Sequence, residues 1–322
     1  LRAGDQFAAG APVYLDRLLD AIPADRSHYP FLYPPLLLPP LVLLAGVARP
    51  LVEMAWIGGS VAAVGFAMRR FGLPWRWALP VLLWRPVLEG IYVGNVAVPL
   101  LACLAVAVRH PAALVIPPVF KVYSGTATLW LIRERRWRSL LLGGLVVAVA
   151  ALVTAGATGL GAWRDWLRGL DWFARSQPVL RDYLYGIALP RYLGALPALA
   201  VGLAVLLLAL RARGTEGLAR LGLATPALSP SVFVHGFLVA IPAMLALRPA
   251  VLWLAVAAMS FGSNAAYWLG PGLAVAGWLI PELRRNCRRS WKKEGVPDPL
   301  GGSAGPWPGE KARLRSGGIA RD

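Results

Sequence analysis

Charged residues are scarce in this sequence. They make up 15% of its 322 residues, whereas a soluble domain usually carries about a quarter. Hydrophobic residues account for 57%, and they stand in long blocks with the charges confined to short clusters between them. This distribution excludes an ordinary soluble domain and predicts a polytopic membrane protein made of helices.

Cysteine and histidine are also rare, with 2 and 3 copies. Cys103 lies in an apolar block and Cys287 in a basic cluster, so the two have no metal-binding spacing. The sequence contains no phosphate-cradling loop and no nucleophile elbow. We therefore expect neither a metal ion nor a cofactor.

Acidic residues are few, because 16 aspartates and glutamates stand against 33 lysines and arginines, for a net charge of +17. In a soluble protein such an excess would indicate a nucleic-acid partner. Here the basic residues lie mostly between apolar blocks, and no basic face is interleaved with aromatic residues. We interpret them as determinants of topology that contact anionic membrane lipids, and we expect no nucleic acid.

The charge pattern divides the chain into three regions. Residues 1–30 are too charged to cross a bilayer and are predicted to form an outer loop. Residues 31–282 are predicted to form the transmembrane domain, and residues 283–322 a basic cytoplasmic tail that is largely disordered. We expect an all-α fold with roughly ten membrane-embedded helices. The apolar segments are 35–48, 51–68, 77–90, 92–108, 111–131, 139–160, 193–210, 216–228, 231–247, 250–266 and 268–282.

Several of these segments are shorter than the ~20 residues of a straight span, so tilted, broken or re-entrant helices are expected. The stretch FLYPPLLLPPLVLL also creates a conflict of topology, because the basic clusters should lie in the cytoplasm. If residues 1–30 lie outside and Arg69 and Arg70 lie in the cytoplasm, segments 35–48 and 51–68 must together cross the membrane an odd number of times. The proline pairs make the first segment the better candidate for an incomplete span. The alternative is that Arg69 and Arg70 lie outside.

An external loop is predicted at 161–192, and it contains an amphipathic helix. Its apolar face carries Trp163, Trp166, Leu167, Leu170 and Phe173, and its charged face carries Arg164, Asp165, Arg168, Asp171 and Arg175. Such a helix would lie in the plane of the head groups with its tryptophans at the interface. The alternative is a helix that packs on the outer surface of the protein itself.

Two polar residues inside apolar segments are candidates for function, because polarity there is costly. His235 follows Ser229 and Pro230 at the predicted outer face, where an imidazole can hold a phosphate or relay a proton. The alternative is a histidine hydrogen-bonded to a neighbouring helix. Lys121 follows a pair of prolines and suits an anionic ligand such as a lipid phosphate, unless its side chain snorkels to the interface.

Other polar residues favour structural roles. Glu53 and Glu89 lie near the ends of spans, which favours topology or ion pairing, and Arg85 stands one helical turn before Glu89. Asn95 marks a turn at the outer face, where we expect it to cap a helix.

An outward-facing carboxylate could act as a general base on an acceptor hydroxyl. The sequence alone does not select one. The candidates are Asp5, Asp16, Asp20, Asp25, Asp165, Asp171 and Asp182.

Four stretches, taken in order, resemble glycosyltransferase family 87 of the GT-C class. They are RAGDQFAAGAPVY, FLYPPLLLPPL, then GNVAVPLLACLAVAV with FKVYSG and RERRWR, and finally SPSVFVHG. Asn95 stands where the family motif has glutamine, and Phe233 where tryptophan is usual. The family's catalytic aspartate would fall before Leu1, so we expect an N-terminally truncated chain and assign no catalytic residue.

The resemblance implies an inverting hexosyltransferase of the cell membrane, as in a bacterial plasma membrane. The donor would be a polyprenyl-phosphate sugar, most often mannose, and the acceptor a lipid or glycan on the outer leaflet. His235 and Lys121 would bind the donor phosphate, and Tyr33 and Asn95 would line the pocket.

Two alternatives remain open at this stage. A transporter or lipid flippase would share the broken helices and intramembrane charge, although the sequence shows no two-fold internal repeat. A catalytically inactive relative of the family is the other.

Overall fold

The computed structural model describes residues 2–14, 31–72, 75–121, 124–176, 185–244, 250–260 and 264–280. In these residues the secondary structure is helical, apart from an isolated bridge between Gly186 and Val232, so the all-α prediction is confirmed for them. Leu1–Val275 form one compact unit and Ala276–Asp322 a second, of which the helical residues 276–280 are described. The predictions that fall outside the described residues concern Asp16, Asp20, Asp25, Asp182, Cys287 and the tail at 283–322.

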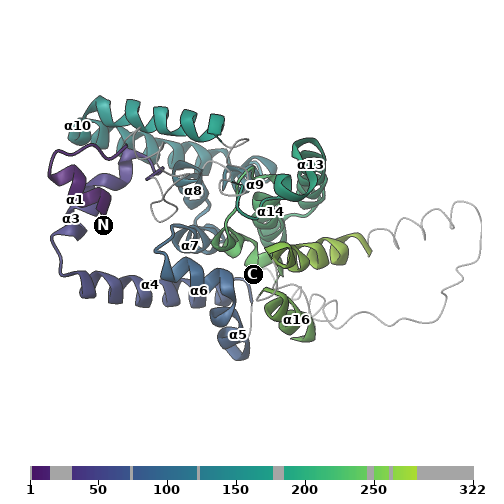
Figure 1. Cartoon of the computed structure of the whole chain (residues 1–322). Helices are drawn as coiled ribbons and strands as arrows, with labels where there is room; N and C mark the ends of the chain where they lie inside the picture. Colours follow the sequence, from purple (N-terminus) through teal and green to yellow (C-terminus); the bar gives the residue numbers. More distant parts are fainter. Residues whose placement is uncertain are drawn as a thin grey trace, which may run out of the picture. The chain divides into compact units, whose positions relative to one another are not determined.

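The proline pairs near the N-terminus start helices and do not interrupt them. Pro39 and Pro40 occupy the first turn of α3, where backbone amides have no helical partner anyway. η1 and α3 comprise 3 and 8 residues, which rise roughly 18 Å and fall short of the ~30 Å hydrocarbon core. This length agrees with the prediction that the segment is not a full span. The first elements are α1 (Arg2–Ala8), η1 (Pro35–Leu37), α3 (Leu38–Ala45) and α4 (Arg49–Arg70) (Figure 1).

Short helices separated by turns form the middle of the chain. α6 and α7 bend by 115° at the turn that contains Asn95, which makes them a broken span or a re-entrant loop. Breaks of this kind were expected from the short apolar segments. The elements are η2 (Trp75–Trp77), α5 (Ala78–Leu83), α6 (Arg85–Tyr92), α7 (Ala97–Ala107), η3 (Pro111–Val115), α8 (Ile116–Phe120) and α9 (Gly125–Arg133).

The long helix α10 (Trp137–Ser176) joins the predicted segment 139–160 to the predicted amphipathic helix. It is kinked at Gly159, whose φ of 76° is a left-handed conformation that favours glycine. The remaining elements are α12 (Leu189–Leu193), α13 (Ala195–Arg211), α14 (Gly214–Leu228), η5 (Val234–Ala240), α15 (Ile241–Met244), α16 (Ala250–Ser260) and η6 (Asn264–Trp268).

The C-terminal half of α10 packs on the N-terminal part of the same chain. The Trp166 Nε1–H donates a hydrogen bond of 3.0 Å to the carbonyl oxygen of Leu32, and Gly169 is buried beside the Leu32 side chain. Leu167, in contrast, is 58% exposed. The helix therefore covers its own protein surface with part of its apolar face, as the alternative prediction held, and leaves another part open.

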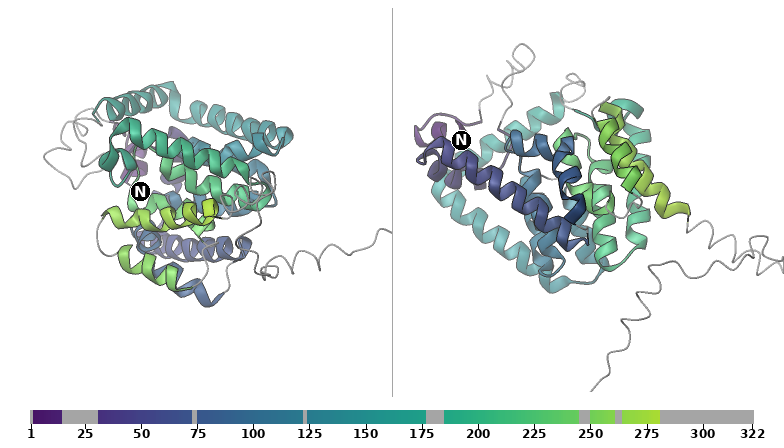
Figure 2. Two further views of the ribbon diagram at one scale, coloured as in Figure 1. Left: turned by 90° about the vertical axis from the view of Figure 1, so that its right-hand side faces the viewer. Right: turned by 90° about the horizontal axis from the view of Figure 1, so that it is seen from below.

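The core of the first unit is built around α14 and η5. All residues of η5 are buried, and so is α14 from Gly217 to Ala227 with the exception of Arg220. The two elements approach closely at Gly222, where an added Cβ would lie 2.4 Å from the carbonyl oxygen of Val239. α13 packs along the outside of α14, and α6 and α7 pack on η5 (Figure 2). Small residues let these backbones approach, as is common between membrane helices.

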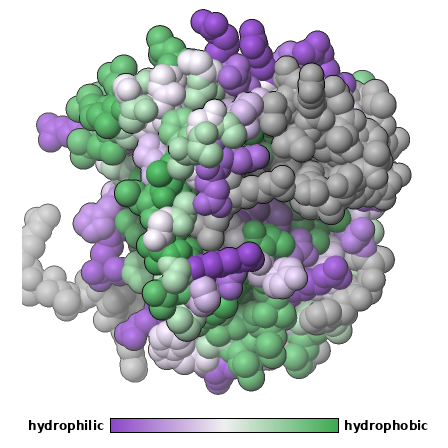
Figure 3. Space-filling model, turned by 60° about the vertical axis from the view of Figure 1, so that its left-hand side comes forward, coloured by the Kyte–Doolittle hydropathy of each residue, from purple (hydrophilic) through white to green (hydrophobic). Residues whose placement is uncertain are grey.

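Helices at the periphery expose large apolar side chains. α4, α10 and α13 present such residues on their outer faces, and Figure 3 shows broad apolar (green) areas on one face of the molecule. Contiguous apolar surface of this kind requires an apolar environment. Examples more than half exposed are Leu51, Met54, Leu141, Leu145, Leu152, Leu196 and Leu207.

Two of the described helices, α4 and α10, are long and apolar enough to cross a membrane, and the bent pair α6–α7 raises the number to three. This finding supports a membrane protein. It does not confirm the expected number of roughly ten embedded helices.

Candidate functional site

The four predicted site residues all lie where helices begin, end or turn. Tyr33 immediately precedes η1, and Asn95 lies between α6 and α7. Lys121 follows α8 with an extended backbone, and His235 is the second residue of η5. Such positions leave backbone and side-chain polar groups available within an apolar fold, because helical hydrogen bonding is incomplete there.

Asn95 connects the α7 N-terminus to Lys121. Its Oδ1 accepts a hydrogen bond of 3.0 Å from the Ala97 amide, at the first residue of α7. The same oxygen accepts one of 2.9 Å from the Lys121 Nζ. The capping interaction expected from the sequence is therefore present, and Asn95 also contacts the ammonium group.

Lys121 directly follows α8, whose first turn contains Pro117 and Pro118 and is not broken by them. The Lys121 amide donates to the Pro117 carbonyl oxygen, and the Ser124 amide and hydroxyl both donate to the Lys121 carbonyl oxygen. These bonds hold the backbone at a position where proline limits helical pairing. The ammonium group is thereby directed by a defined turn and is not the end of an extended surface side chain.

Tyr33 joins the same group of residues. Its hydroxyl interacts electrostatically with the Asn95 side chain and the Val96 backbone. The Tyr14 hydroxyl donates a hydrogen bond of 2.8 Å to the Tyr33 carbonyl oxygen, and Phe31 stacks edge-on against Tyr33 with centroids 5.6 Å apart. Burial raises the pKa of the Tyr14 phenol, so this hydroxyl remains a donor at neutral pH.

His235 lies beside Glu89, which the sequence indicated only as an ion-pairing residue. The His235 Nδ1 is 3.6 Å from the Glu89 Oε1, and His235 and Lys121 interact electrostatically. Glu89 also lies 3.9 Å from the Arg85 Nε, which confirms the predicted pair one turn apart. Periodicity along α6 could show that Arg85 and Glu89 share a face, but only packing places that face against η5.

These contacts define a polar cluster of Tyr33, Glu89, Asn95, Lys121 and His235 that draws on five separate parts of the chain. Its cations are suited to an anion, because ammonium and protonated imidazole groups bind phosphate oxygens through charge-assisted hydrogen bonds.

The described aspartates occupy the surface. Asp165 and Asp171 form ion pairs with Arg168 and Arg175 along α10, and Asp5 is exposed in the first turn of α1. Glu53 pairs with Arg49 at 2.8 Å on exposed α4, in line with the prediction of ion pairing. Among these residues no general base is assigned.

The described residues also form an apolar groove of about 480 Å³. It lies between α8 and α9, the two helices that flank the Lys121 turn. Its lining residues are Val115, Pro118, Val119, Gly125, Thr128, Leu129 and Ile132. No residue of the polar cluster lines the groove, but the two helices that form it flank Lys121 in the sequence.

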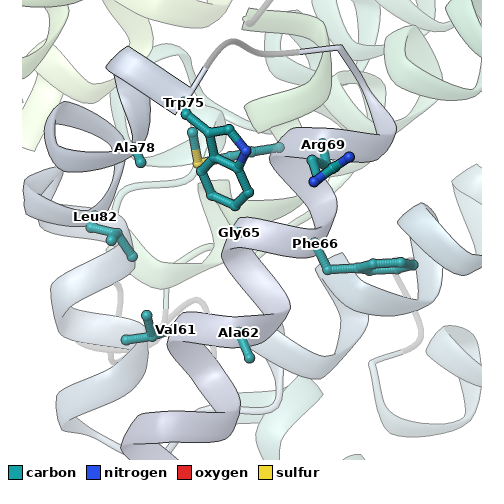
Figure 4. Close-up of a pocket in the computed structure, with 9 residues that line it drawn as sticks. Val61, Ala62, Gly65, Phe66, Arg69, Trp75, Ala78 and Leu82 are labelled. Carbon is teal, nitrogen blue, oxygen red and sulfur yellow. The ribbon is translucent and has the colours of Figure 1, made fainter.

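A second groove of about 280 Å³ is lined by residues of α4, η2 and α5 (Figure 4). Arg69 is its charged lining residue, and Trp75 lies over Gly65, with an added Cβ at Gly65 placed 3.5 Å from the indole. Neither the lysine nor the histidine of the polar cluster lines it. We assign it no part in the chemistry of the cluster.

Comparison with known proteins adds a family assignment. No curated protein and no solved structure matches the chain. The sequence model of glycosyltransferase family 87 matches residues 31–239, which is more than half of the chain and includes every residue of the polar cluster. The apolar faces and long apolar helices indicate a membrane protein. The chain therefore belongs to glycosyltransferase family 87.

Proposed function

We propose that this glycosyltransferase moves a hexose, mannose in the first instance, from a polyprenyl-phosphate donor to a hydroxyl group of a lipid or glycan. The transfer takes place at the outer leaflet of the cell membrane. The observation that supports the proposal is the polar cluster, in which Lys121 and His235 interact electrostatically, together with an apolar groove between the two helices that flank Lys121. A polyprenyl-phosphate donor has an anionic phosphate, which suits the cations, and a long apolar chain, which suits the groove.

The reaction is an inverting displacement. The acceptor oxygen attacks the anomeric carbon, and the bond from that carbon to the phosphate oxygen breaks with its electron pair going to the phosphate. The acceptor hydroxyl loses its proton to an outward-facing aspartate that acts as general base. The products are the glycosylated acceptor and polyprenyl phosphate.

Lys121 and His235 act on the leaving phosphate. Its negative charge increases as the bond breaks, so a cation beside it stabilises the transition state more than the bound donor. Asn95 holds the lysine ammonium through the 2.9 Å hydrogen bond, and Tyr33 supports the Asn95 side chain. In this proposal the arrangement supplies preorganised charge without requiring a metal ion.

The donor's lipid chain lies in the groove between α8 and α9. That groove is almost entirely apolar, and the hydroxyl of Thr128 is already hydrogen-bonded to the Leu114 carbonyl oxygen at 2.9 Å. An isoprenoid chain needs no polar partner. Its phosphate end would then meet the Lys121 turn, with the chain directed along the helices.

Membranes that contain the protein test the proposal when they receive labelled polyprenyl-phosphate mannose. His235→Gln and Lys121→Gln should each reduce transfer by about 100-fold, as for other groups that stabilise developing negative charge. His110→Gln is the matched control, because His110 is exposed in the turn between α7 and η3. Transfer that survives the double substitution would contradict the site, and absence of transfer from every polyprenyl-phosphate sugar would contradict the donor class.

A further inference from the structure

Glu89 places a carboxylate beside His235 without yet forming a hydrogen bond to it. The distance of 3.6 Å between the Nδ1 and the Oε1 is about 0.7 Å longer than a good hydrogen bond. The Nδ1 is fully buried and has no hydrogen-bond partner. A buried polar atom without a partner is costly, and among the ion pairs of the described residues the Glu89 carboxylate is the acceptor that lies nearest to the Nδ1.

Close packing between α6 and η5 holds the two side chains near each other. An added Cβ at Gly90 would lie 2.8 Å from the Leu238 Cδ1 and 3.5 Å from the His235 Cβ, so α6 rests directly on η5. The Phe233 ring stacks with the imidazole, with centroids 6.0 Å apart and planes inclined by 15°. The position of the imidazole is therefore set by packing, while its Nδ1 still needs an acceptor.

The charged groups around His235 show what the Glu89 carboxylate contributes as an acceptor. Lys121 and Arg85 are the cations that act on His235 and Glu89, at positions described above. A further positive charge on the imidazole would be disfavoured next to Lys121. Burial of the ring acts in the same direction as Lys121. The Glu89 carboxylate is the group that opposes both, because it favours the protonated ring, in which both nitrogens are donors.

We propose that Glu89 is a positioning residue for His235 in sugar transfer. When the donor phosphate binds, the His235 Nδ1–H donates to the Glu89 carboxylate, and the Nε2–H donates to a phosphate oxygen. Glu89 thus selects the protonation state and the orientation in which the ring can stabilise the leaving phosphate, as an aspartate does for the histidine of a catalytic triad. This inference rests on the proposed function, because it requires a phosphate-bearing donor.

Steady-state kinetics of the full chain with polyprenyl-phosphate mannose test the role of Glu89. Glu89→Gln keeps the shape but removes the charge, so kcat should fall by roughly 10- to 100-fold, as for other carboxylates that orient a histidine. The donor KM should change by less than about 3-fold, since the interaction strengthens as the phosphate gains charge. Glu89→Asp should recover part of the loss.

A double-substitution cycle separates positioning from general structural damage. In a His235→Gln background, Glu89→Gln should lower kcat by less than about a further 2-fold, because the effects of two residues that act as a unit are not additive. Glu53→Gln is the matched control, since Glu53 also pairs with an arginine four residues away but lies exposed on α4. It should retain wild-type kinetics and thermal stability.

Four results would overturn the proposal. Full activity of Glu89→Gln would do so while leaving the proposed function intact, and so would losses that multiply independently in the double variant. An equal loss in Arg85→Gln would show that Glu89 acts through its arginine and not through His235. A wild-type chain that transfers sugar from no polyprenyl-phosphate donor would overturn the proposed function, and this inference with it.

Discussion

Asn95 links two structural requirements at the scale of a single residue. One oxygen atom accepts hydrogen bonds from the amide that starts α7 and from the ammonium group of Lys121. A neutral amide can satisfy both donors without cancelling the positive charge that a phosphate needs. The choice of asparagine over aspartate at this position therefore concerns charge and not geometry.

Asn95→Asp is expected to separate these two effects. The carboxylate keeps the acceptor oxygen and adds a favourable charge at the N-terminus of α7, so thermal stability should be maintained. It also forms an ion pair with Lys121 and competes with the donor phosphate, so the donor KM should rise by about 10-fold or more. Kinetics and thermal unfolding of the purified protein measure both quantities. A variant with unchanged donor KM would show that Lys121 does not bind the phosphate.

At the scale of the helix, close contact between α14 and η5 determines where His235 lies. η5 is buried along its whole length, and its Val239 carbonyl oxygen would meet a Cβ at Gly222 at 2.4 Å. A rigid backbone group cannot move aside as a flexible side chain can. The absence of a side chain at Gly222 is thus a condition for the position of η5.

Gly222→Ala should destabilise the fold by about 1–3 kcal/mol through overpacking. Because η5 would shift, transfer activity should fall as well, although residue 222 does not belong to the polar cluster. Gly144→Ala on α10 is the matched control, since an added Cβ there has no atom within 4 Å and alanine favours a helix. Thermal unfolding in detergent measures the difference, and equal stability of the two variants would contradict the predicted clash.

At the scale of the whole molecule, large apolar side chains lie on the outside of the described helices as well as in the core. Lysine, histidine and glutamate of the polar cluster lie among the inner helices, whereas leucines of α4, α10 and α13 face outward. Burying these leucines in lipid is favourable by roughly 25 cal/mol for each Å² of apolar surface. The membrane therefore completes the apolar environment that the fold leaves open.

Spin labels on α10 should report this environment directly. A label at Leu145, which is 61% exposed, should be more accessible to oxygen than to a water-soluble nickel complex. A label at Arg138, exposed near the start of the same helix, should show the reverse order. Accessibility measurements in reconstituted bilayers provide the comparison. Equal accessibility at both sites would contradict a lipid-facing α10.

Sequence patterns predicted the class of fold and part of the site. Apolar blocks indicated helices, the proline pairs near the N-terminus indicated an incomplete span, and an asparagine at a turn indicated a cap. His235 and Lys121 were selected because polar groups in apolar segments are costly. The structure brings both into one cluster with Tyr33 and Asn95, while their binding role remains a prediction.

The sequence by itself determined the helical, membrane-embedded character of this protein, because hydrophobicity and proline act on nearby residues of the chain. Only the tertiary structure decided that Glu89 lies beside His235, that Trp166 packs on Leu32, and that few of the described helices are long enough to span a membrane. These features depend on contacts between helices far apart in sequence. Such contacts are set by side-chain shape and by glycine-mediated approach, which local periodicity does not encode.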